Sequence, residues 1–515
     1  MATYKIGTRG SLLAVTQSTL VKNQLEEISG EKFELVTIKT QGDEITNKPL
    51  WQLEGKDFFT KELDEALLKG EVDFVIHSYK DLGSVRPAGI KLAAVTERRF
   101  AHDILLIEKK TIGLFANWQG PFVVGTSSPR RIVNLSRSLG PYLPFAERTN
   151  LTVACETLRG NVNSRIKKLK DGKYHAITLA LAGIERLAHT EKSAQELREL
   201  LSGLNYFVLP QSVFPSAASQ GALGIELREN RDDDGKLLKI LQHLVHEQTV
   251  EEVLRERKAF KDYGGGCHLA VGIHVKKVGE TYLHVHKGEA DGKVIDEKWL
   301  EGVTHPPLPP GKKLFVGLPR GERAGVVYDQ YLRKVAAETK QNLRNKHAFV
   351  TSRYCIPSLS GEDAQAPEGI WAAGTKTAAL LAKEGFWVNG TSDSLGTADL
   401  LSLQSSRALQ MMSPHLRTFK VLTHESGTSD LGEVVGCYER KTTDVDKAYE
   451  RSLEAVGACF WTSFAQYEAF LKKFPFLAGA RHFCGLGKTW QEFSRRKLPV
   501  AALASMEDFY SLQKD

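Results

Sequence analysis

A cysteine that directly follows three glycines is the residue whose setting most suggests chemistry. Gly264, Gly265 and Gly266 precede Cys267. Glycine allows positive φ and close approach by another group, and the segment is expected to be a loop between two elements, where reactive groups tend to be presented. The thiol could form a covalent bond, or it could be a passive small residue of a tight turn. The segment by itself leaves both open, because it lacks the His and Asn spacing of a papain-type nucleophile.

Several arginines near expected strand ends form a second group. Each one alone is most simply a solvated surface cation. Together, beside glycines and hydroxyls, they indicate a small polyanionic ligand, because a guanidinium binds a carboxylate through two hydrogen bonds and keeps its charge. Nucleic acid is less favoured, since no basic stripe with interleaved aromatics is seen. The group consists of Arg9, Arg130, Arg131, Arg159, Arg165 and Arg186.

The turn before two of these arginines is a candidate anion site. Ser127 and Ser128 precede Pro129, and Arg130 and Arg131 follow it. A serine cap, a proline at the first helical position and free N–H groups together give a helix start that favours anions.

Asp81 is the candidate acid–base residue. It comes one residue after Lys80 and three after Ser78, at the end of an expected strand. In a cationic pocket its carboxylate would stay ionised and could move a proton or stabilise a developing cation. The alternative is a turn aspartate that caps a helix. Lys56 lies in a glycine-containing loop that could close over an anion or could be a plain exposed loop.

The segments around these residues alternate between strand-like and helix-like patterns, which favours α/β domains with mainly parallel sheets. In such domains ligands bind at the carboxyl ends of strands, where the polar groups above fall. The expected strands are residues 4–8, 33–40, 72–77, 122–125, 176–181 and 269–275, and the expected helices are residues 11–28, 60–68 and 250–260.

The composition is that of a globular chain. Its 515 residues are 42% hydrophobic and 25% charged, with a net charge of +7, and at roughly 100–200 residues per domain three or four domains are expected. None of the 6 cysteines forms a C-x-x-C pair, so no metal site is expected. Neither a secretory leader nor an apolar run of about 18 residues is seen. The expectation is a cytoplasmic protein with reduced thiols and no membrane or nucleic-acid partner.

Two features organise the second half of the chain. Residues 303–313 hold 4 of the 18 prolines and are expected to be a stiff, extended linker with few contacts. Beyond them is a weak repeat, for which two similar α/β halves are the simplest account and coincidence between short matches is the rival. Its matching pairs are Thr351 with Thr462, Ser352 with Ser463, Gly374 with Gly487, and Thr377 with Thr489.

These motifs together resemble the porphobilinogen deaminase family, also called the hydroxymethylbilane synthases. The resemblance covers about the first 300 residues, in the order of the family, and implies two periplasmic-binding-protein-like α/β domains plus a small α+β domain that carries the cysteine. The matching segments are residues 6–11, 55–56, 61–63, 77–81, 125–131, 158–162, 220–222 and 265–267.

The resemblance also implies a reaction. A dipyrromethane cofactor, held by Cys267 through a thioether, primes the growing chain and is not turned over. Asp81, with Lys80 beside it, helps to expel ammonia from porphobilinogen and stabilises the cationic azafulvene. Four rounds give a linear tetrapyrrole, which water releases as hydroxymethylbilane. Each pyrrole carries an acetate and a propionate, for which the arginines are the expected counter-charge.

Site residues carry over from the family by motif position. Two departures stand out: Leu82 and Gly83 replace the usual Val-Pro, and His102 replaces a usual Arg, so one carboxylate could be bound more weakly or differently. The residues expected at the substrate are Lys56, on the mobile active-site loop of the family, Arg9, Arg159, Arg165 and Arg186. The residues expected at the cofactor are Cys267, Arg9, Ser11, Ser78, Lys80, Asp81, Thr126, Ser127, Arg130, Arg131, Arg159, Gly160, Arg165 and Gln220.

The second part looks like the uroporphyrinogen-III synthase family, which has two similar α/β domains joined by a two-strand ladder with the substrate between them. The match is diffuse and rests on the repeat and on residues 435–438. It implies that Tyr438, Ser463 and Thr489 contact the tetrapyrrole. The alternative is that these are sheet-edge and helix-cap hydroxyls.

The expected protein is a fused enzyme for two successive steps: a transferase that makes hydroxymethylbilane and a lyase that cyclises it, with D-ring inversion, to uroporphyrinogen III. One alternative is a deaminase with an inactive or regulatory C-terminal region. A remote one is a two-lobed small-anion binder, which would have no use for Cys267 or Asp81. The expected domains are 1–103 with 217–238, 104–216, 239–302 with the cofactor cysteine, the linker 303–313, and the two-lobed synthase-like region 314–515.

Overall fold

The computed structural model describes residues 3–40, 60–83, 85–266, 268–337, 342–359 and 366–513. Lys56 and Cys267, both expected at the site, lie outside these described residues. The chain forms two compact units. The first consists of Met1–Lys277, Val285–Glu297 and Ser406–Pro414, and the second of Val278–His284, Lys298–Ser405 and His415–Asp515.

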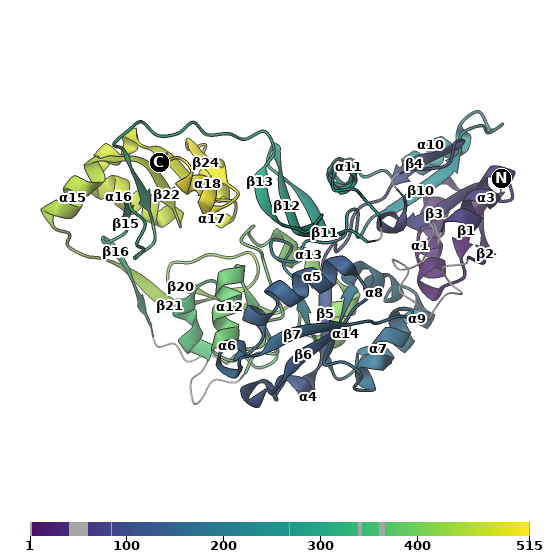
Figure 1. Ribbon diagram of the computed structural model, residues 1–515, viewed down its shortest axis with the longest axis horizontal. Coiled ribbons are helices and arrows are strands. Elements are labelled where there is room, and N and C mark those ends of the chain that lie inside the picture. Colours follow the sequence, from purple (N-terminus) through teal and green to yellow (C-terminus); the bar gives the residue numbers. More distant parts are fainter. Residues whose placement is uncertain are drawn as a thin grey trace. The chain divides into compact units, whose positions relative to one another are not determined.

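The first sheet of the first unit has the strand order β2-β1-β3-β10-β4 (Figure 1). Strand β1 runs parallel to β2 and β3, whereas β10 runs antiparallel to both β3 and β4. The expectation of a mainly parallel sheet is therefore only partly right, because β10 rejoins this sheet after the chain has built a second one. The strands are β1 (Thr3–Arg9), β2 (Lys32–Ile38), β3 (Phe74–Ser78), β4 (Ile90–Val95) and β10 (Leu223–Arg228).

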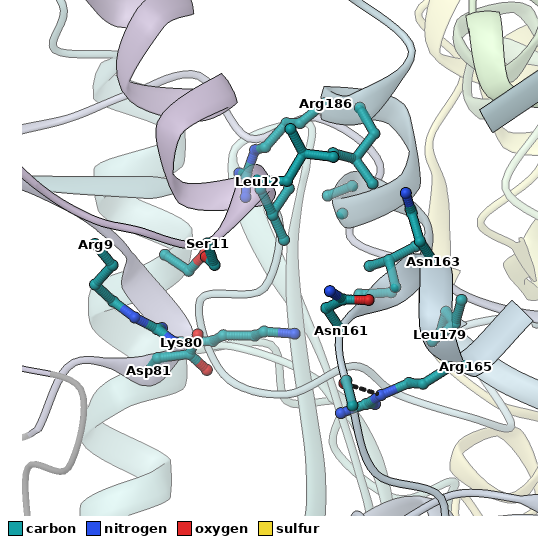
Figure 2. Close-up of a pocket in the computed structure, with 18 of the residues that line it drawn as sticks. Arg9, Ser11, Leu12, Lys80, Asp81, Asn161, Asn163, Arg165, Leu179 and Arg186 are labelled. Carbon is teal, nitrogen blue, oxygen red and sulfur yellow. Dashed lines mark hydrogen bonds between the residues drawn. The ribbon is translucent and has the colours of Figure 1, made fainter. Parts of the chain in front are cut away.

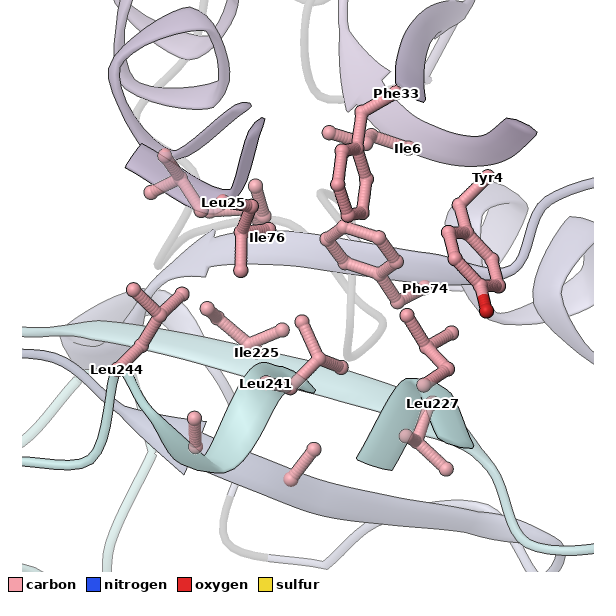
Figure 3. Packing of buried hydrophobic residues seen from close by; sticks show 14 of the residues in the cluster. Tyr4, Ile6, Leu25, Phe33, Phe74, Ile76, Ile225, Leu227, Leu241 and Leu244 are labelled. Carbon is pink, nitrogen blue, oxygen red and sulfur yellow. The ribbon is translucent and has the colours of Figure 1, made fainter. Parts of the chain in front are cut away.

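An apolar cluster fixes helices α1 (Leu12–Ser29) and α10 (Lys236–Gln242) against this sheet (Figure 3). Leu25 of α1 and Leu241 of α10 are fully buried, and the ring of Phe74 on β3 meets that of Phe33 edge-on with centroids 6.0 Å apart. Burial of each such side chain contributes roughly 1.5–3 kcal/mol. This packing fixes the positions of β1 and β3 in the sheet, and residues that follow their carboxyl ends line a cavity. Helix α3 (Lys61–Lys69) belongs to the same part of the unit.

The second sheet of the first unit has the order β7-β6-β8-β5-β9. Here β6 runs parallel to β7 and β8, and β5 runs antiparallel to β8 and β9. Three helices begin just after the carboxyl ends of β6, β7 and β8, so their N-termini gather at one edge of the sheet. The strands are β5 (Asp103–Glu108), β6 (Pro121–Gly125), β7 (Thr152–Glu156), β8 (Ala176–Ala180) and β9 (Leu204–Val208), and the helices are α4 (Lys109–Ile112), α5 (Pro129–Ser138), α6 (Ala146–Thr149), α7 (Val162–Lys170), α8 (Leu181–Leu187) and α9 (Glu191–Leu201).

Helix α11 (Glu247–Asp262) leads into the glycine loop. Its last residue is followed by Tyr263, whose hydroxyl lies 3.0 Å from Nδ1 of His286 and donates to Glu297 over 3.2 Å. The base of the loop is therefore tied to a three-stranded sheet of order β11-β12-β13. Its strands are β11 (Ala270–Val278), β12 (Thr281–Ala290) and β13 (Lys293–Leu300).

The second unit contains two further sheets, of orders β15-β14-β22-β23-β24 and β16-β21-β20-β17-β18-β19. Every pairing in them is parallel except that of β16 with β21. The strands are β14 (Lys313–Val316), β15 (Val326–Tyr328), β16 (Leu332–Ala336), β17 (His347–Val350), β18 (Gly369–Ala372), β19 (Gly390–Thr391), β20 (Phe419–His424), β21 (Glu433–Thr442), β22 (Val456–Trp461), β23 (Arg481–Gly485) and β24 (Val500–Leu503). The helices from this half of the chain are α12 (Thr375–Lys383), α13 (Ala398–Gln404), α14 (Arg407–Met412), α15 (Lys447–Glu454), α16 (Phe464–Lys473), α17 (Lys488–Arg495) and α18 (Met506–Tyr510), of which α14 belongs to the first unit.

The proline-rich segment packs against other parts of the second unit, to which it belongs. The backbone N–H of Leu308 donates to the carbonyl of Leu512 over 2.7 Å, and Arg481 donates to the carbonyl of Pro306 over 2.6 Å. The ring of His305 meets that of Phe483 edge-on at 5.0 Å. The expectation of few contacts is therefore wrong, because proline has no N–H but its carbonyl, and the residues between prolines, remain free to bond. No helix within the described ranges has the length and apolarity that crossing a membrane requires.

Candidate functional site

A cavity of about 740 Å³ lies in the first unit, at the carboxyl ends of β1 and β3 and beside the starts of α7 and α8 (Figure 2). Most of the residues expected at the site converge here. In Figure 2, Lys80 extends from the side of Arg9 and Asp81 toward Asn161. The expected residues that line the cavity are Arg9, Ser11, Ser78, Lys80, Asp81, Arg131, Arg159, Gly160, Arg165, Arg186 and Gln220.

Asp81 and Lys80 sit on a short 3-10 turn, η2 (Tyr79–Asp81), directly after β3. Asp81 is exposed within the pocket, and the Lys80 ammonium donates to Oε1 of Gln220 over 3.2 Å. Removal from solvent lowers the pKa of Lys80 to about 8, although the charge of Asp81 opposes the shift. A carboxylate beside an ammonium with a lowered pKa is an arrangement that can exchange protons near neutral pH.

Arg257, on α11, holds this turn in place. Its guanidinium donates to the carbonyls of Leu82 over 3.1 Å and Gly83 over 2.7 Å, and to that of Tyr79 over 3.3 Å. It also stacks 4.6 Å from the centre of the Tyr79 ring. The contacts to Leu82 and Gly83 are to main-chain atoms, so the departure from Val-Pro at these positions leaves them intact. Sequence reasoning missed Arg257, whose only signal is its place on the helix that leads to the glycine loop.

Two of the expected ligand arginines are engaged by a protein carboxylate. Asp103, fully buried, accepts from Arg130 over 2.7 Å and from Arg131 over 2.7 and 3.1 Å. Burial alone would raise the pKa of Asp103, but the two guanidinium groups hold it well below its usual range. Arg130 does not line the cavity and Arg131 does. Contact of Arg130 with a ligand, expected from sequence, would need this ion pair to rearrange.

Other arginines keep their charge available to a ligand. Arg165 donates to the carbonyl of Gly160, a residue with a φ of 116°, over 2.7 Å, and Arg186 donates to the carbonyl of Gly221 over 2.9 Å. Among the described residues, no carboxylate forms an ion pair with Arg165 or Arg186. Burial lowers the pKa of each to about 10. Half-buried cations of this kind favour an anionic ligand that takes up their charge.

The side chains of Thr126 and Ser127, in the turn before α5, form hydrogen bonds with main-chain groups of the protein. The hydroxyl of Ser127 donates to the Leu158 carbonyl over 2.7 Å, and Thr126 Oγ1 accepts from the N–H of Ser128 over 3.3 Å. Neither Ser127 nor Thr126 lines the cavity. Ser128 is the N-cap of α5, but its side chain makes no capping hydrogen bond. The cavity instead receives Asn161, from the matching segment 158–162, and also Lys39 and Asn163, which sequence reasoning did not single out.

A buried group of Asp64, His77 and Glu226 brings three potential metal ligands within 4.8 Å of one another. The guanidinium of Arg86 already lies among them: it donates to Glu226 over 2.8 Å through two nitrogens and also contacts Asp64. A cation is therefore already present between these carboxylates, and the group acts as an ion-pair network that joins α3, β3 and β10.

In the second unit the three expected residues fall into two places. Ser463 is the N-cap of α16 and accepts from the N–H of Gln466 over 3.3 Å, and Thr489 donates to the carbonyl of Thr462 over 3.3 Å. These two thus flank Thr462, at the carboxyl end of β22. Tyr438 lies on β21 of the other sheet, its ring 5.7 Å from that of Tyr354.

The fold and site of the first unit define a class of protein: an α/β protein with a cationic pocket built from strand ends and helix starts for a polyanionic ligand. The comparisons with known proteins name the family. A family model, the dipyrromethane cofactor binding domain of porphobilinogen deaminase, matches residues 4–236. The porphobilinogen deaminase of Lachnospira eligens is 39% identical over 293 residues, 56% of this chain and 90% of that protein, and that of Synechococcus elongatus is 34% identical over 65% of this chain and 97% of that protein. The chain belongs to the porphobilinogen deaminase family.

Dipyrromethane is accordingly the cofactor of this domain. The unit fits such a group, because an acidic dipyrrole needs several cations in one cavity and Lys80, Arg165 and Arg186 supply them. For the second part, a uroporphyrinogen-III synthetase from Helicobacter pylori aligns with 39% of this chain and 97% of its own, at 13% identity and a TM-score of 0.27. A score this low supports no inference about that part.

Proposed function

We propose that this chain makes hydroxymethylbilane from porphobilinogen and then cyclises it to uroporphyrinogen III. The observation that carries the first activity is the pocket where Asp81, Lys80, Arg165 and Arg186 meet. Membership of the porphobilinogen deaminase family supports the same reaction. The dipyrromethane cofactor, attached through Cys267, supplies the pyrrole end from which the product chain is extended.

The chain's own residues bind, orient and move protons. Arg165 and Arg186 bind the acetate and propionate groups of the pyrroles, which offsets the cost of burying those guanidinium groups. Asp81, the last residue of the η2 turn, assists the loss of ammonia and stabilises the cation that remains on the substrate. Lys80, bonded to Gln220, places a positive charge beside Asp81.

The second activity rests on the described sheets of the second unit. Helix α17 begins at Lys488, shortly after β23 ends. Gly487, just before this helix, lies against the loop that follows β19, so closely that a Cβ on Gly487 would be 2.6 Å from the carbonyl oxygen of Ser394. The carboxyl ends of strands from the two sheets thus approach each other, which is where ligands of α/β folds bind. A linear tetrapyrrole held folded between them would close with ring inversion. Tyr438, Ser463 and Thr489 remain the proposed contacts.

One assay separates the fused enzyme from a deaminase alone. Purified full-length protein is supplied with porphobilinogen, and the isomers of the oxidised uroporphyrin products are separated. Free hydroxymethylbilane closes without help to the type I isomer, so a mainly type III product supports the second activity. Type I product from the intact chain would leave a deaminase with a non-catalytic second part. Tyr438→Phe and Thr489→Val should lower the type III fraction partially and leave porphobilinogen consumption unchanged.

A small-anion binding protein is the alternative from another class. It would bind porphobilinogen without releasing ammonia. Ammonia release that is lost in Asp81→Asn, with porphobilinogen binding retained, excludes it.

A further inference from the structure

A cluster of cations gathers on one face of the strand pair β16–β21 in the second unit. Lys334 of β16 and Arg440 of β21 stand directly opposite each other in the antiparallel register. Like charges in directly opposed positions destabilise a sheet. Arg353, at the start of η5 (Arg353–Leu359), adds a third cation, because its guanidinium and the Lys334 ammonium lie 5.0 and 5.8 Å from the centre of the Tyr354 ring.

Two more basic groups lie close to these cations. His424, at the end of β20, lies opposite Tyr438 in the register, with the ring centroids 6.0 Å apart. Burial lowers the pKa of His424 to about 4, and the charges of Arg440, Lys488 and Lys334 add to the shift. Lys488, at the start of α17, donates to the carbonyl of Thr428. The charges of Arg440, Lys488 and Lys334 therefore all act on the His424 ring.

The cations of the cluster are not paired with carboxylates in the part of the chain that the structure describes: no ion pair there involves Lys334, Arg353, Arg440 or Lys488. Asp329 is near enough to act on Lys334, but it accepts hydrogen bonds from Tyr331, Leu332 and Gln466. Burial and the neighbouring Arg440 lower the pKa of Lys334 to about 8, although much of the residue is exposed. The neighbouring Lys441, in contrast, is paired with Glu439 at 2.5 Å.

Two tyrosines pack beneath the cluster: Tyr354 is half-buried, and Tyr438 is only 3% exposed. The rings of Tyr354 and Tyr438 lie 5.7 Å apart, and the Lys334 ammonium is 5.6 Å from the centre of the Tyr438 ring. Aromatic faces suit a flat, conjugated or pyrrolic body, and surrounding cations suit carboxylates at its edge. The arrangement of charge and rings is that of a site for an aromatic polycarboxylate.

We infer that Lys334, Arg353, Arg440 and Lys488 form the polycarboxylate-binding site of the second unit and hold the acetate and propionate groups of a folded tetrapyrrole over Tyr354 and Tyr438. The choice of a tetrapyrrole rests on the proposed second activity. The binding of a polycarboxylate rests on the cluster itself. Binding of either a tetrapyrrole or another polycarboxylate is favourable for the same reason: the carboxylates of the ligand neutralise the positive charges of Lys334 and Arg440, which lie opposite each other.

Titration of the full-length, cofactor-loaded protein with uroporphyrin III tests the inference, with the dissociation constant measured by calorimetry. Uroporphyrin III carries an acetate and a propionate on every pyrrole. We expect Arg440→Gln and Lys334→Gln each to weaken its binding about tenfold, the effect of losing one charge-assisted hydrogen bond. Lys441→Gln, on the same strand but paired with Glu439, is the matched control and should bind as the parent does. Any uroporphyrin bound in the first unit is common to all three variants.

Varying the number of ligand carboxylates and the salt concentration provides a second test. Coproporphyrin III, which lacks the acetate carboxylates, should bind more weakly to the parent and lose less affinity in Arg440→Gln. Added salt should weaken uroporphyrin binding less in the variant than in the parent, because fewer charges are screened. Equal affinity of parent, Arg440→Gln and Lys334→Gln for uroporphyrin, or no binding by the parent, overturns the inference.

The product assay and the binding measurement can contradict the two proposals independently of each other. If the intact chain forms only the type I isomer while Arg440→Gln still loses uroporphyrin affinity, the proposed cyclisation is wrong and the polycarboxylate site stands. If the intact chain forms type III and Arg440→Gln forms it equally well with unchanged uroporphyrin affinity, cyclisation stands and the site is wrong.

Discussion

Glu185 accepts a hydrogen bond from the hydroxyl of Ser406 over 2.6 Å. Ser406 precedes α14, a helix from the C-terminal half of the sequence that belongs to the first unit. The same buried carboxylate accepts from the backbone N–H groups of Arg407 and Ala408, each over 3.1 Å. These are first-turn donors of α14, which have no partner inside the helix. A carboxylate at a helix N-terminus is also favoured by the helix dipole.

Glu185 stands next to Arg186 on α8, and Arg186 lines the pocket. Helix α8 is thus held on one side by α14 and on another side places the Arg186 guanidinium in the pocket. The expected boundary at residue 314 does not describe this arrangement, because residues 406–414 pack with the first unit. Cutting the chain within the linker would remove α14 from α8, so the tests here use substitutions in the full-length protein.

Glu185→Gln should destabilise the first unit by about 2 kcal/mol, because the amide nitrogen cannot accept and leaves a buried donor without a partner. We also expect the KM for porphobilinogen to rise as α8 shifts Arg186. Thermal unfolding and steady-state kinetics measure the two effects. Glu191→Gln, at the exposed start of the neighbouring helix α9, is the control. Unchanged stability and KM in Glu185→Gln would mean that α14 is attached without supporting α8.

Asp81→Asn should reduce kcat at least about 10²-fold, the usual scale for a positioned acid–base group. The substitution keeps size and hydrogen bonding but removes the charge beside Lys80. Circular dichroism and the cofactor mass should match those of the parent. Near-normal turnover would return Asp81 to the role of a turn residue.

Cys267→Ser should remove the cofactor. The intact mass of the parent protein should exceed the sequence mass by one dipyrromethane, and the variant should show the sequence mass alone. The test uses mass spectrometry and does not depend on activity. Cys155→Ser, at a half-buried cysteine of β7, should keep the added mass. An active parent protein with an unmodified mass would contradict covalent attachment.

Arg257→Lys should lower kcat about tenfold with a smaller change in KM, because one ammonium cannot bond the carbonyls of Tyr79, Leu82 and Gly83 together as a planar guanidinium does. Loss of about 1.4 kcal/mol of positioning at the transition state gives that factor. Lys258→Gln, exposed on the same helix, is the control. Retained cofactor mass separates loss of positioning from loss of cofactor attachment. If KM rises and kcat is unchanged, Arg257 does not position Asp81.

Lys80 should titrate near pH 8 in cofactor-free Cys267→Ser protein, since burial lowers its pKa. As pH rises through 8 the group loses its proton, and the pocket loses one positive charge. Labelling with an amine-directed reagent, read by peptide mass spectrometry, should be half-maximal near pH 8, against about 10.4 for exposed lysines. The anionic cofactor should move the midpoint upward in the parent protein. A midpoint near that of exposed lysines in the variant would contradict desolvation at this site.

Much of the first unit follows from local patterns. Alternation of strand and helix signals marked β1, α1, β2, α3, β3, β6, β8, α11 and β11 within a few residues of their observed bounds, because hydrophobic periodicity is a property of neighbouring residues. The motifs also marked Arg9, Lys80, Asp81 and Arg165, which the fold brings to one cavity. Polar residues at strand ends could be expected to meet, since parallel strands end at the same edge.

The sequence by itself thus determined the α/β class, the deaminase family and the candidate residues of the first pocket. Only the tertiary structure decided which charges are available. Arg130 and Arg131 read as ligand arginines until Asp103, distant in sequence, is seen to pair with both. Lys334 and Arg440 read as unrelated surface cations until the β16–β21 register opposes them. Glu185 gains its partner from a helix more than 200 positions away. The physical reason is that a side chain's charge is set by what lies within a few ångströms of it, and chain folding brings those neighbours from distant parts of the sequence.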